Sequence, residues 1–423
     1  MKIAVIGGGY VGLVSGACFA ELGNDVTIIE IDPAKVLAIN EQQPPIYEIG
    51  LEDLLKKHIG NRLCASITYD SVASADIIFI CVGTPPNSDG SANLSYIESA
   101  SAMIGAARRT VPTYCVVVVK STVPPGTTAK IVCPGVLQSA HKTEGEIGFV
   151  MNPEFLREGR AIADFMHPDR IVIGSADDRA FNYVAEAYHK IDVPVIRTSL
   201  SAAEMIKYTS NAFLAMKISF SNEIGNICKQ LHIDVYEVMR GVGLDHRIGT
   251  QFLNAGVGFG GSCFPKDVSS LISLAKAIGE DPLILHAVLK VNTQQPNRLL
   301  KLLRARIGNL NGKKIAVLGL AFKDNTEDIR DSKAIPVIQE LLLNGASVSA
   351  YDPMAVEAMR KLFPTVTYCH SAGHALDGAD ACLVMTEWPE FGKINKEFER
   401  MKTRVIIEGR RILSCNGTEG ICW

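Results

Sequence analysis

One short stretch of the chain carries residue types that could perform covalent chemistry. It reads Gly256-Val257-Gly258-Phe259-Gly260-Gly261-Ser262-Cys263-Phe264-Pro265-Lys266-Asp267. Glycines let the backbone approach a ligand closely, and successive exposed N–H groups in such a loop attract anions. Positive potential beside Cys263, to which Lys266 adds, favours the thiolate, which is the nucleophilic form of cysteine. The same residues also fit a glycine-rich turn that ends in an inert structural cysteine, so both interpretations stay open.

Two other pairs have the four-residue spacing that places side chains on one helix face. Lys207 and Asn211 follow a Ser201–Glu204 capping box in a largely apolar run, which predicts a long buried helix. The lysine could stabilise a developing oxyanion, or it could extend its charged end to the surface.

Glu154 and Glu158 form the second pair, after Pro153, which suits the first position of a helix. Paired carboxylates can serve acid–base chemistry, although a solvated helix face explains the same pattern.

The start of the chain predicts a dinucleotide site. A strand at 2–6 leads into Gly7-x-Gly9-x-x-Gly12 and then a helix, and Glu30 follows a second strand. In this motif the first glycine makes the tight turn, the second admits the pyrophosphate, and the third lets the helix pack on the strand. A carboxylate about 20 residues further on binds the ribose hydroxyls of NAD. Because it would also repel a 2′-phosphate, NAD is expected rather than NADP.

Continuous apolar strands alternate with helical segments through the first half of the chain. Strands at 76–82 and 115–120 are followed by loops that contain Thr84 and Thr122. This alternation predicts a parallel, doubly wound sheet, whose ligands bind at the carboxyl ends of the strands. Either threonine could equally be an ordinary loop residue.

A second β-α-β pattern begins at Lys314, without a second glycine fingerprint. We therefore predict an α/β protein with two Rossmann-like doubly wound domains joined by a long central helix. The expected domains are an NAD-binding Rossmann domain at 1–200, a helical dimerisation region with the cysteine loop at 201–300, and a Rossmann-like, nucleotide-domain-like unit at 301–423.

Composition excludes several classes of function. A net charge of −3 gives no reason to expect nucleic acid or an anionic membrane as a partner. No apolar run is long enough to span a bilayer, and the N-terminus lacks the pattern of a signal peptide. The 11 scattered cysteines lack a C-x-x-C pair, which fits reduced thiols in a cytoplasm and no metal site.

Together the motifs resemble those of the UDP-glucose/GDP-mannose dehydrogenase family over nearly the whole chain, and the UDP-glucose 6-dehydrogenases in particular. The matching blocks are Gly7-x-Gly9-Tyr10-Val11-Gly12, Val82-Gly83-Thr84-Pro85, Lys120-Ser121-Thr122-Val123-Pro124, Asn152-Pro153-Glu154-Phe155-Leu156-Arg157-Glu158-Gly159, Lys207-x-x-x-Asn211, Asp245-x-Arg247-Ile248-Gly249, the cysteine stretch and Gly319-x-x-Phe322-Lys323. Two residues depart from the family pattern. Glu30 replaces a commoner aspartate, and Glu408-Gly409-Arg410-Arg411 has arginine where asparagine is usual.

The resemblance implies a four-electron oxidation of UDP-glucose to UDP-glucuronate, for polysaccharide synthesis, with two NADH formed through a cysteine thiohemiacetal and thioester. It implies a homodimer or larger homo-oligomer, and it makes the C-terminal Rossmann-like domain at 301–423 the UDP-sugar-binding domain. The catalytic residues would be Cys263, Lys207, Asn211, Asp267, Glu154 and Thr122. The cofactor contacts would be Gly7, Gly9, Tyr10, Val11, Gly12, Glu30, Lys35, Thr84, Thr122, Glu158, Lys266 and Arg330. The substrate contacts would be Glu154, Phe155, Leu156, Arg157, Glu158, Lys207, Asn211, Arg247, Phe252, Leu253, Asn254, Gly256, Phe259, Gly260, Phe322, Lys323 and Arg410.

Three alternatives remain open at this point. The substrate could be GDP-mannose or another nucleotide-sugar. A two-electron dehydrogenase of the β-hydroxyacid type would share the helix lysine and asparagine but would not need Cys263. A non-catalytic NAD-binding regulatory protein would leave the cysteine, the lysine and the paired glutamates unexplained.

Overall fold

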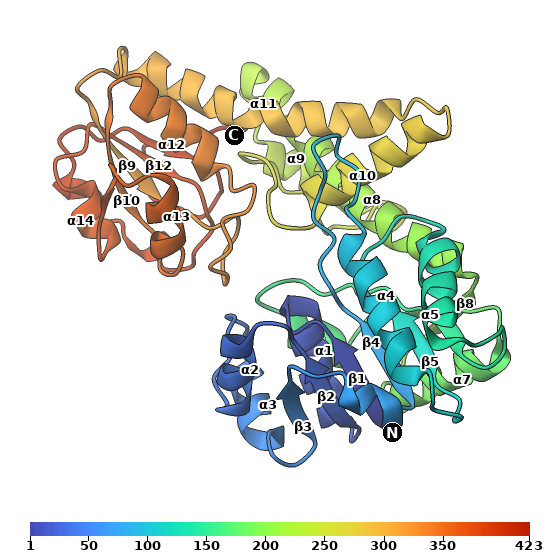
Figure 1. Cartoon of the computed structure of the whole chain (residues 1–423). Helices are drawn as coiled ribbons and strands as arrows, with labels where there is room; N and C mark the ends of the chain where they lie inside the picture. The colour runs from blue at the N-terminus through green and yellow to red at the C-terminus, as the bar shows by residue number, and fades with distance from the viewer. The chain divides into compact units, whose positions relative to one another are not determined.

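The computed structural model describes all 423 residues, which divide into two compact units, Met1–Ser210 and Asn211–Trp423. Each unit is built on one β-sheet with helices packed against it (Figure 1). The α/β class with two Rossmann-like sheets and a long central helix is confirmed. The expected boundaries of three domains stay a prediction.

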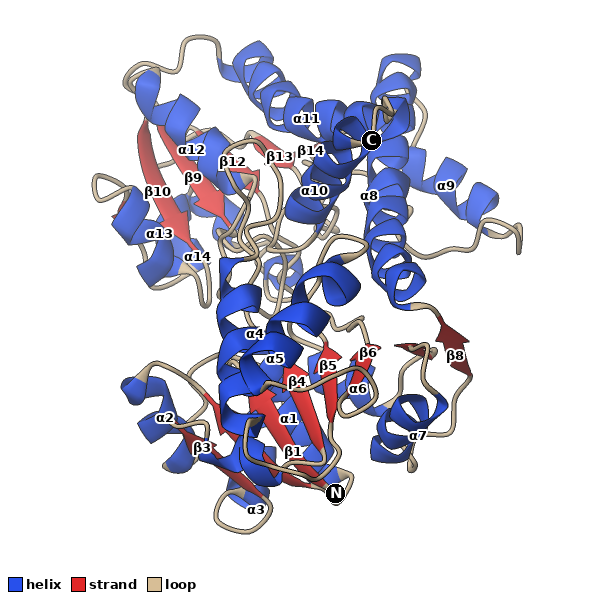
Figure 2. Ribbon diagram, turned by 45° about the vertical axis from the view of Figure 1, so that its right-hand side comes forward, coloured by secondary structure: helices blue, strands red, loops and turns tan.

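The sheet of the first unit has eight strands in the order β3-β2-β1-β4-β5-β6-β7-β8 (Figure 2). These strands are β1 (Lys2–Ile6), β2 (Asp25–Ile29), β3 (Leu63–Ser66), β4 (Ile77–Ile80), β5 (Val116–Val119), β6 (Gly148–Met151), β7 (Ile171–Gly174) and β8 (Val195–Thr198). The order reverses between β1 and β4, which is the switch point where doubly wound sheets bind dinucleotides. The expectation of a wholly parallel sheet is wrong at one place, because β6 and β7 pair antiparallel through the single pair Met151 and Gly174.

Helices cover both faces of this sheet, so its central strands are buried on both sides. The helices of this unit are α1 (Tyr10–Glu21), α2 (Pro33–Asn40), α3 (Leu51–His58), α4 (Ser95–Arg108), α5 (Cys133–Ala140), α6 (Ala161–Met166) and α7 (Asp178–Ala187). β4 reads Ile-Ile-Phe-Ile and β5 reads Val-Val-Val-Val, and every residue of both strands is buried. A continuous apolar run is what a strand covered on both faces requires.

The long central helix is α8, which runs unbroken from Leu200 to Leu231. The expected capping box is wrong in its position. The helix starts one residue before Ser201, and Ser199 Oγ accepts the N–H of Ala202 instead. Glu204 is drawn away from the helix end, because its carboxylate accepts the N–H groups of Gly126 and Thr128 at 2.5 and 2.8 Å.

The second unit contains the helices α9 (Val235–Gly243), α10 (Phe264–Ala277) and α11 (Leu283–Ile307), followed by a six-stranded parallel sheet. The strand order is β11-β10-β9-β12-β13-β14. The strands are β9 (Lys314–Leu318), β10 (Ser347–Tyr351), β11 (Thr367–Tyr368), β12 (Ala381–Val384), β13 (Ile406–Glu408) and β14 (Thr418–Gly420), and the helices between them are α12 (Ala334–Leu343), α13 (Val356–Leu362) and α14 (Ala372–Leu376). β14 was not anticipated, since its three residues carry no apolar pattern.

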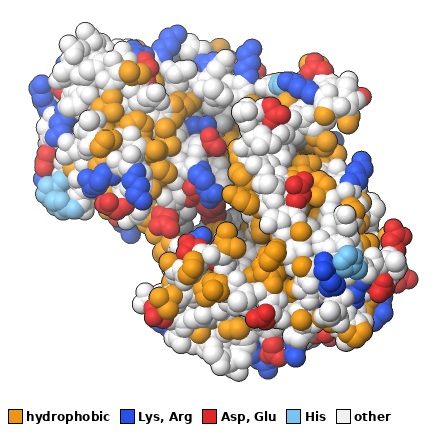
Figure 3. Space-filling view, viewed as in Figure 1, with side chains coloured by type: hydrophobic (Ala, Val, Ile, Leu, Met, Phe, Trp, Pro, Cys, Tyr) orange, Lys and Arg blue, Asp and Glu red, His pale blue; other side chains and the backbone are white.

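Lysine, arginine, aspartate and glutamate side chains are interspersed over the face shown in Figure 3, in keeping with a net charge of −3. None of the helices, α8 included, combines the length and the apolar character that crossing a bilayer demands.

Candidate active site

The glycine loop between β1 and α1 has the geometry of a dinucleotide-binding turn. Gly7 adopts a positive φ of 100°, and a Cβ on Gly12 would lie 1.9 Å from the carbonyl oxygen of Gly7. Neither position therefore admits a larger residue without a shift of the backbone. A Cβ on Gly9 would meet no atom within 4 Å. These are the three roles that the motif predicts, because the second glycine is the one that faces the pyrophosphate.

Glu30 lies at the carboxyl end of β2 and is buried, with an exposed fraction of 7%. One carboxylate oxygen accepts the N–H of Gly8 at 2.9 Å, and the other accepts the N–H of Asp32 at 3.1 Å. The acidic residue is thus held against the glycine loop, where a ribose would extend from a pyrophosphate. Lys35 is half-buried on α2, the helix that follows.

Thr84 and Thr122 come from the loops after β4 and β5, at the same edge of the sheet as Glu30. The hydroxyl of Thr84 donates to the carbonyl oxygen of Thr122 at 2.9 Å, which joins the two loops. Both loops begin at the carboxyl ends of neighbouring parallel strands, where ligands of doubly wound sheets bind.

The segment 152–160 is not the helix that the sequence predicts, so Glu154 and Glu158 do not share a helix face. Glu154 instead turns back on its own chain, and its carboxylate accepts the N–H of Leu156 at 2.5 Å. The first helix after this turn is α6, which begins only at Ala161. Arg157 pairs with Asp164 of that helix at 2.6 Å and stays at the surface.

Lys207 and Glu154 form a buried ion pair in the first unit. Lys207 Nζ lies 2.8 Å from a carboxylate oxygen of Glu154, and their side chains are 4% and 6% exposed. The ammonium also lies 5.4 Å from the centre of the Phe155 ring. A surface lysine with its charged end in water does not fit this position. A buried pair of opposite charges is costly to assemble, and such pairs often mark functional sites.

The glycine–cysteine loop of the second unit ends at the N-terminus of α10. Cys263 is the residue before the helix, and its carbonyl oxygen accepts the N–H of Asp267 at 2.8 Å. A helix N-terminus stabilises negative charge, as a thiolate requires. Ser262 Oγ lies 3.5 Å from the Cys263 sulfur. The cysteine is half-buried, so its sulfur is neither sealed in the core nor fully exposed.

Asp267 is the centre of a polar cluster beside Cys263. Its carboxylate accepts the side-chain N–H of Asn211 at 2.7 Å and pairs with Lys266 at 2.6 Å. Asp267 is 1% exposed, so a fully buried carboxylate is satisfied by a neutral donor and a cation. Lys207 and Asn211 both belong to α8, four residues apart, so the one helix carries a member of each cluster.

The loop itself is packed too closely for side chains at its glycines. A Cβ on Gly260 would lie 2.4 Å from the carbonyl oxygen of Asp331, and one on Gly261 would lie 2.7 Å from the Phe322 ring. The Gly261 N–H donates to the carbonyl oxygen of Arg330 at 2.8 Å. The loop is therefore anchored on the segment after β9, which also carries Lys323.

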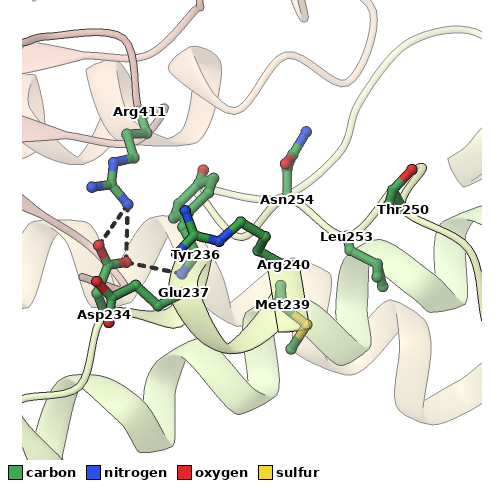
Figure 4. A pocket seen from close by; sticks show the side chains of 9 residues that line it. All are labelled: Asp234, Tyr236, Glu237, Met239, Arg240, Thr250, Leu253, Asn254 and Arg411. Carbon is green, nitrogen blue, oxygen red and sulfur yellow. Dashed lines mark hydrogen bonds and ion pairs between the residues drawn. The ribbon is translucent and has the colours of Figure 1, made fainter. Parts of the chain in front are cut away.

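The remaining predicted contacts of the second unit are spread over three places. Leu253 and Asn254 line a cavity of about 500 Å³ with residues of α9, where Arg411 points at Asp234 (Figure 4). Arg410, the neighbour of Arg411, instead donates to the carbonyl oxygen of Gly258 in the glycine loop.

Two arginines that were predicted to contact the substrate or the cofactor are exposed, and each pairs with an aspartate two residues earlier. Arg247 pairs with Asp245 at 2.6 Å, and Arg330 pairs with Asp328 at 2.7 Å. Phe252 has a positive φ of 63°, and its ring packs 6.1 Å from that of Phe264.

Comparison with known proteins assigns all three regions of this chain to one family. Residues 1–192 match the NAD binding domain of the UDP-glucose/GDP-mannose dehydrogenase family, residues 201–294 its central domain, and residues 316–415 its UDP binding domain. The chain belongs to the UDP-glucose/GDP-mannose dehydrogenase family.

Relatives of this dehydrogenase are similar over their full length. It is 47% identical to the UDP-glucose 6-dehydrogenase AglM of Haloferax volcanii, over 98% of the chain and 97% of the relative. It is 46% identical to TuaD of Bacillus subtilis, also a UDP-glucose 6-dehydrogenase, over 98% and 90%. The solved UDP-glucose dehydrogenase of Pyrobaculum islandicum superposes with a TM-score of 0.95 at 41% identity, covering 100% and 98%.

Several residues that shape the site of this dehydrogenase were missed by sequence reasoning. Amide side chains of α8 and α11 hold the glycine–cysteine loop: Asn292 accepts the N–H of Phe259 at 2.7 Å, Gln295 donates to the carbonyl oxygen of Gly256 at 2.9 Å, and Asn222 accepts the N–H of Gly256 at 2.7 Å. Buried amides inside apolar helices are a signal that could have identified them.

Glu48 has a comparable supporting role in the first unit. Its carboxylate accepts the N–H groups of Gly159 and Ala161 at 2.7 and 2.8 Å, and it contacts the hydroxyl of Tyr10. The dinucleotide helix α1 is thereby connected to the turn that carries Glu154 and Glu158. Burial and the carboxylate of Glu48 raise the pKa of Tyr10 well above its usual range, so its phenol stays protonated.

Proposed function

We propose that this chain is an NAD-dependent UDP-glucose 6-dehydrogenase. It oxidises the 6-hydroxymethyl group of UDP-glucose to a carboxylate and reduces two NAD per sugar. The observation that carries the proposal is Cys263, which stands at a helix N-terminus beside a buried Asp267–Asn211–Lys266 cluster. A two-electron dehydrogenase has no use for such a thiol. The full-length similarity to proteins named UDP-glucose 6-dehydrogenase supports the choice of sugar nucleotide.

The residues of the first unit fit the cofactor. The Gly7–Gly12 turn would hold the pyrophosphate, and Glu30 would bind the ribose. Thr84 and Thr122 would lie beside the nicotinamide. Bound NAD supplies the acceptor for each of the two hydrides that leave the sugar carbon.

In the first half of the reaction the 6-hydroxyl loses a proton and its carbon loses a hydride, which gives an aldehyde. The buried Glu154–Lys207 pair supplies the charges for this step. Its carboxylate accepts or relays the proton, and its ammonium stabilises negative charge on the oxygen.

In the second half the Cys263 thiolate adds to the aldehyde carbon, and the oxygen takes up a proton to give a thiohemiacetal. Loss of that proton and of the second hydride leaves a thioester on the cysteine. Water then attacks, the thiolate leaves, and the carboxylate product is released with two protons. Sulfur suits both roles because a thiolate attacks well and leaves well. Asn211 donates to the oxyanion, and Asp267 orients the water.

We propose the same substrate-contact set that the family motifs indicate, with Lys323 and Arg410 as the cations for the diphosphate. Arg411, which lines the cavity beside α9, is a further candidate cation for the diphosphate. A homodimer is also proposed, since Phe213, Phe220, Ile227 and Leu231 on α8 expose between 50 and 61% of their surface. Eleven free cysteines support a reducing compartment such as the cytoplasm.

One assay tests the proposed function. Absorbance of NADH is followed with UDP-glucose, UDP-galactose, UDP-N-acetylmannosamine and GDP-mannose, each limiting, with NAD or NADP in excess. We expect two NADH per UDP-glucose, one UDP-glucuronate by mass and little activity with NADP. One NADH per sugar would contradict the thioester route, and preference for GDP-mannose would move the chain to the other branch of its family.

A further inference from the structure

Lys120 is a buried cation that the proposed chemistry leaves unused. It follows β5 directly and is 3% exposed. Its Nζ donates to Asn152 Oδ1 at 3.1 Å and to the hydroxyl oxygen of Tyr188 at 3.1 Å. Tyr188 in turn donates to the same Asn152 oxygen at 2.7 Å, which closes a triangle of three hydrogen bonds. A cation held only by neutral oxygens is expensive to bury, so this position calls for a reason.

The triangle connects two segments that leave the sheet side by side. β5 and β6 pair in parallel, with Val119 opposite Met151, so Lys120 and Asn152 stand next to each other at the carboxyl edge. The Asn152 side chain also donates to the carbonyl oxygen of Val172 on β7 at 2.8 Å. Thr122 lies two residues after Lys120, and Glu154 lies two residues after Asn152. The geometry of both catalytic candidates therefore depends on this triangle.

The charge of Lys120 is governed by groups on every element packed around it. Burial lowers the pKa of Lys120 to about 8. Three neighbouring groups act in the opposite direction and raise this pKa: the Cys81 thiol after β4, the Glu154 carboxylate and the Cys18 thiol of α1. The ammonium of Lys207 on α8 acts with burial. Rings of Phe79, Phe165 and Tyr188 lie 5.8 to 5.9 Å from Nζ and add no formal charge.

The neutral amine matches this environment better than the ammonium does. An amine has two N–H donors and meets two acceptors here, whereas an ammonium has a third donor. A positive charge on Lys120 also works against both members of the Glu154–Lys207 pair. It attracts the Glu154 carboxylate, which must interact with a proton of the substrate, and it repels the Lys207 ammonium, which must stabilise an oxyanion.

We propose that Lys120 is a positioning residue for the oxidation, because its amine holds Asn152 and the turn that carries Glu154. When Lys120 loses a proton, its positive charge no longer acts on the Glu154–Lys207 pair, and the pair becomes active. This inference rests on the proposed function. It assigns a pH-dependent role to a residue outside the proposed sets of substrate and cofactor contacts.

The test compares pH profiles of kcat with saturating UDP-glucose and NAD. In the unmutated enzyme we expect log kcat to rise through a transition near pH 8. Lys120→Met should lower kcat about 10- to 100-fold, as displacement of a positioned group does, with KM for UDP-glucose little changed and the transition gone. Tyr188→Phe keeps the ring but removes one acceptor, so the ammonium is less stable and the transition should move down by about 0.5 to 1 pH unit.

A matched control is Lys142→Met, which removes a half-buried lysine of the same unit that donates only to the carbonyl oxygen of Val111. This variant should keep the profile of the unmutated enzyme. NAD affinity and the melting temperature of each variant verify folding, and if Lys120→Met does not fold, the profile of Tyr188→Phe decides. A transition that stays in place in Tyr188→Phe, or that persists in Lys120→Met, overturns the proposal. Failure of the proposed function is distinct, because the unmutated chain would then make no NADH from UDP-glucose.

Discussion

At the scale of single residues, the candidate chemistry depends on how deeply four charged or nucleophilic side chains are buried. Glu154, Lys207 and Asp267 are each less than 7% exposed, and each has a partner of opposite charge. Cys263 differs, because it is half-buried and lies at the positive end of α10. Buried pairs keep their geometry through a reaction cycle, whereas a nucleophile must stay accessible to the carbon that it attacks.

Replacement of Cys263 tests the covalent part of the mechanism. Cys263→Ser keeps the shape but exchanges a thiol for a hydroxyl that ionises poorly and leaves poorly, so turnover should fall about 10³-fold or more. NAD and UDP-glucose should still bind. Over a long incubation, mass spectrometry of the peptide carrying residue 263 should detect a sugar ester in the serine variant and none in Cys263→Ala. If the alanine variant made the acid at a normal rate, the cysteine would be structural.

At the scale of elements, the cofactor site consists of the strand β1, the glycine turn and the helix α1. The turn and the helix pack so closely that a side chain does not fit between them. α1 is buried along Gly12–Ala20, and its first turn touches the loop that follows β1. The two glycines of this turn differ sharply in their surroundings. Gly12 faces the protein, and Gly9 faces away from it, so one supports the fold and the other supports the ligand.

The pair Gly12→Ala and Gly9→Ala separates these two functions. A Cβ at position 12 would lie 1.9 Å from the carbonyl oxygen of Gly7, so this variant should lose stability by several °C in melting temperature. A Cβ at position 9 meets nothing within 4 Å, so the apo protein should melt normally but bind NAD at least about tenfold more weakly. Differential scanning fluorimetry and NAD titration measure both effects. Equal NAD affinity in Gly9→Ala would contradict the assigned pyrophosphate contact.

At the scale of the whole molecule, α8 leaves an apolar stripe uncovered in the single chain. Phe213, Phe220 and Ile227 recur every seven residues and expose 55, 50 and 53% of their surface. A sevenfold spacing keeps side chains on one face of a helix, as in helices that pair with each other. A contiguous stripe of this kind is a typical subunit interface.

We expect Phe220→Glu to weaken the proposed dimer, since a carboxylate would be buried without a partner at the centre of the stripe. Sedimentation velocity at micromolar concentration should show the unmutated chain as a dimer and the variant shifted toward the 45.7 kDa monomer. Leu343→Glu, at an apolar position of α12 that is 74% exposed, is the matched control and should remain dimeric. An unmutated chain that sediments as a monomer would refute the assembly.

The sequence by itself determined the elements whose signal is local. The strands β1, β2 and β10 and the glycine turn follow from consecutive residues, because apolar runs and glycine spacing act over a few positions. The cysteine loop and the start of α10 were also predictable, since both are written in one stretch.

Only the tertiary structure decided which partners meet across the chain. Glu154 lies in a turn rather than a helix because its carboxylate accepts a nearby N–H and because Glu48, which is 111 residues before Gly159, holds Gly159 and Ala161. Glu204 satisfies Gly126 and Thr128 instead of capping α8. The Lys120–Asn152–Tyr188 triangle joins three segments that no local pattern relates. Burial and long-range hydrogen bonds depend on how the strands are ordered in the sheet, and that order is a property of the whole fold.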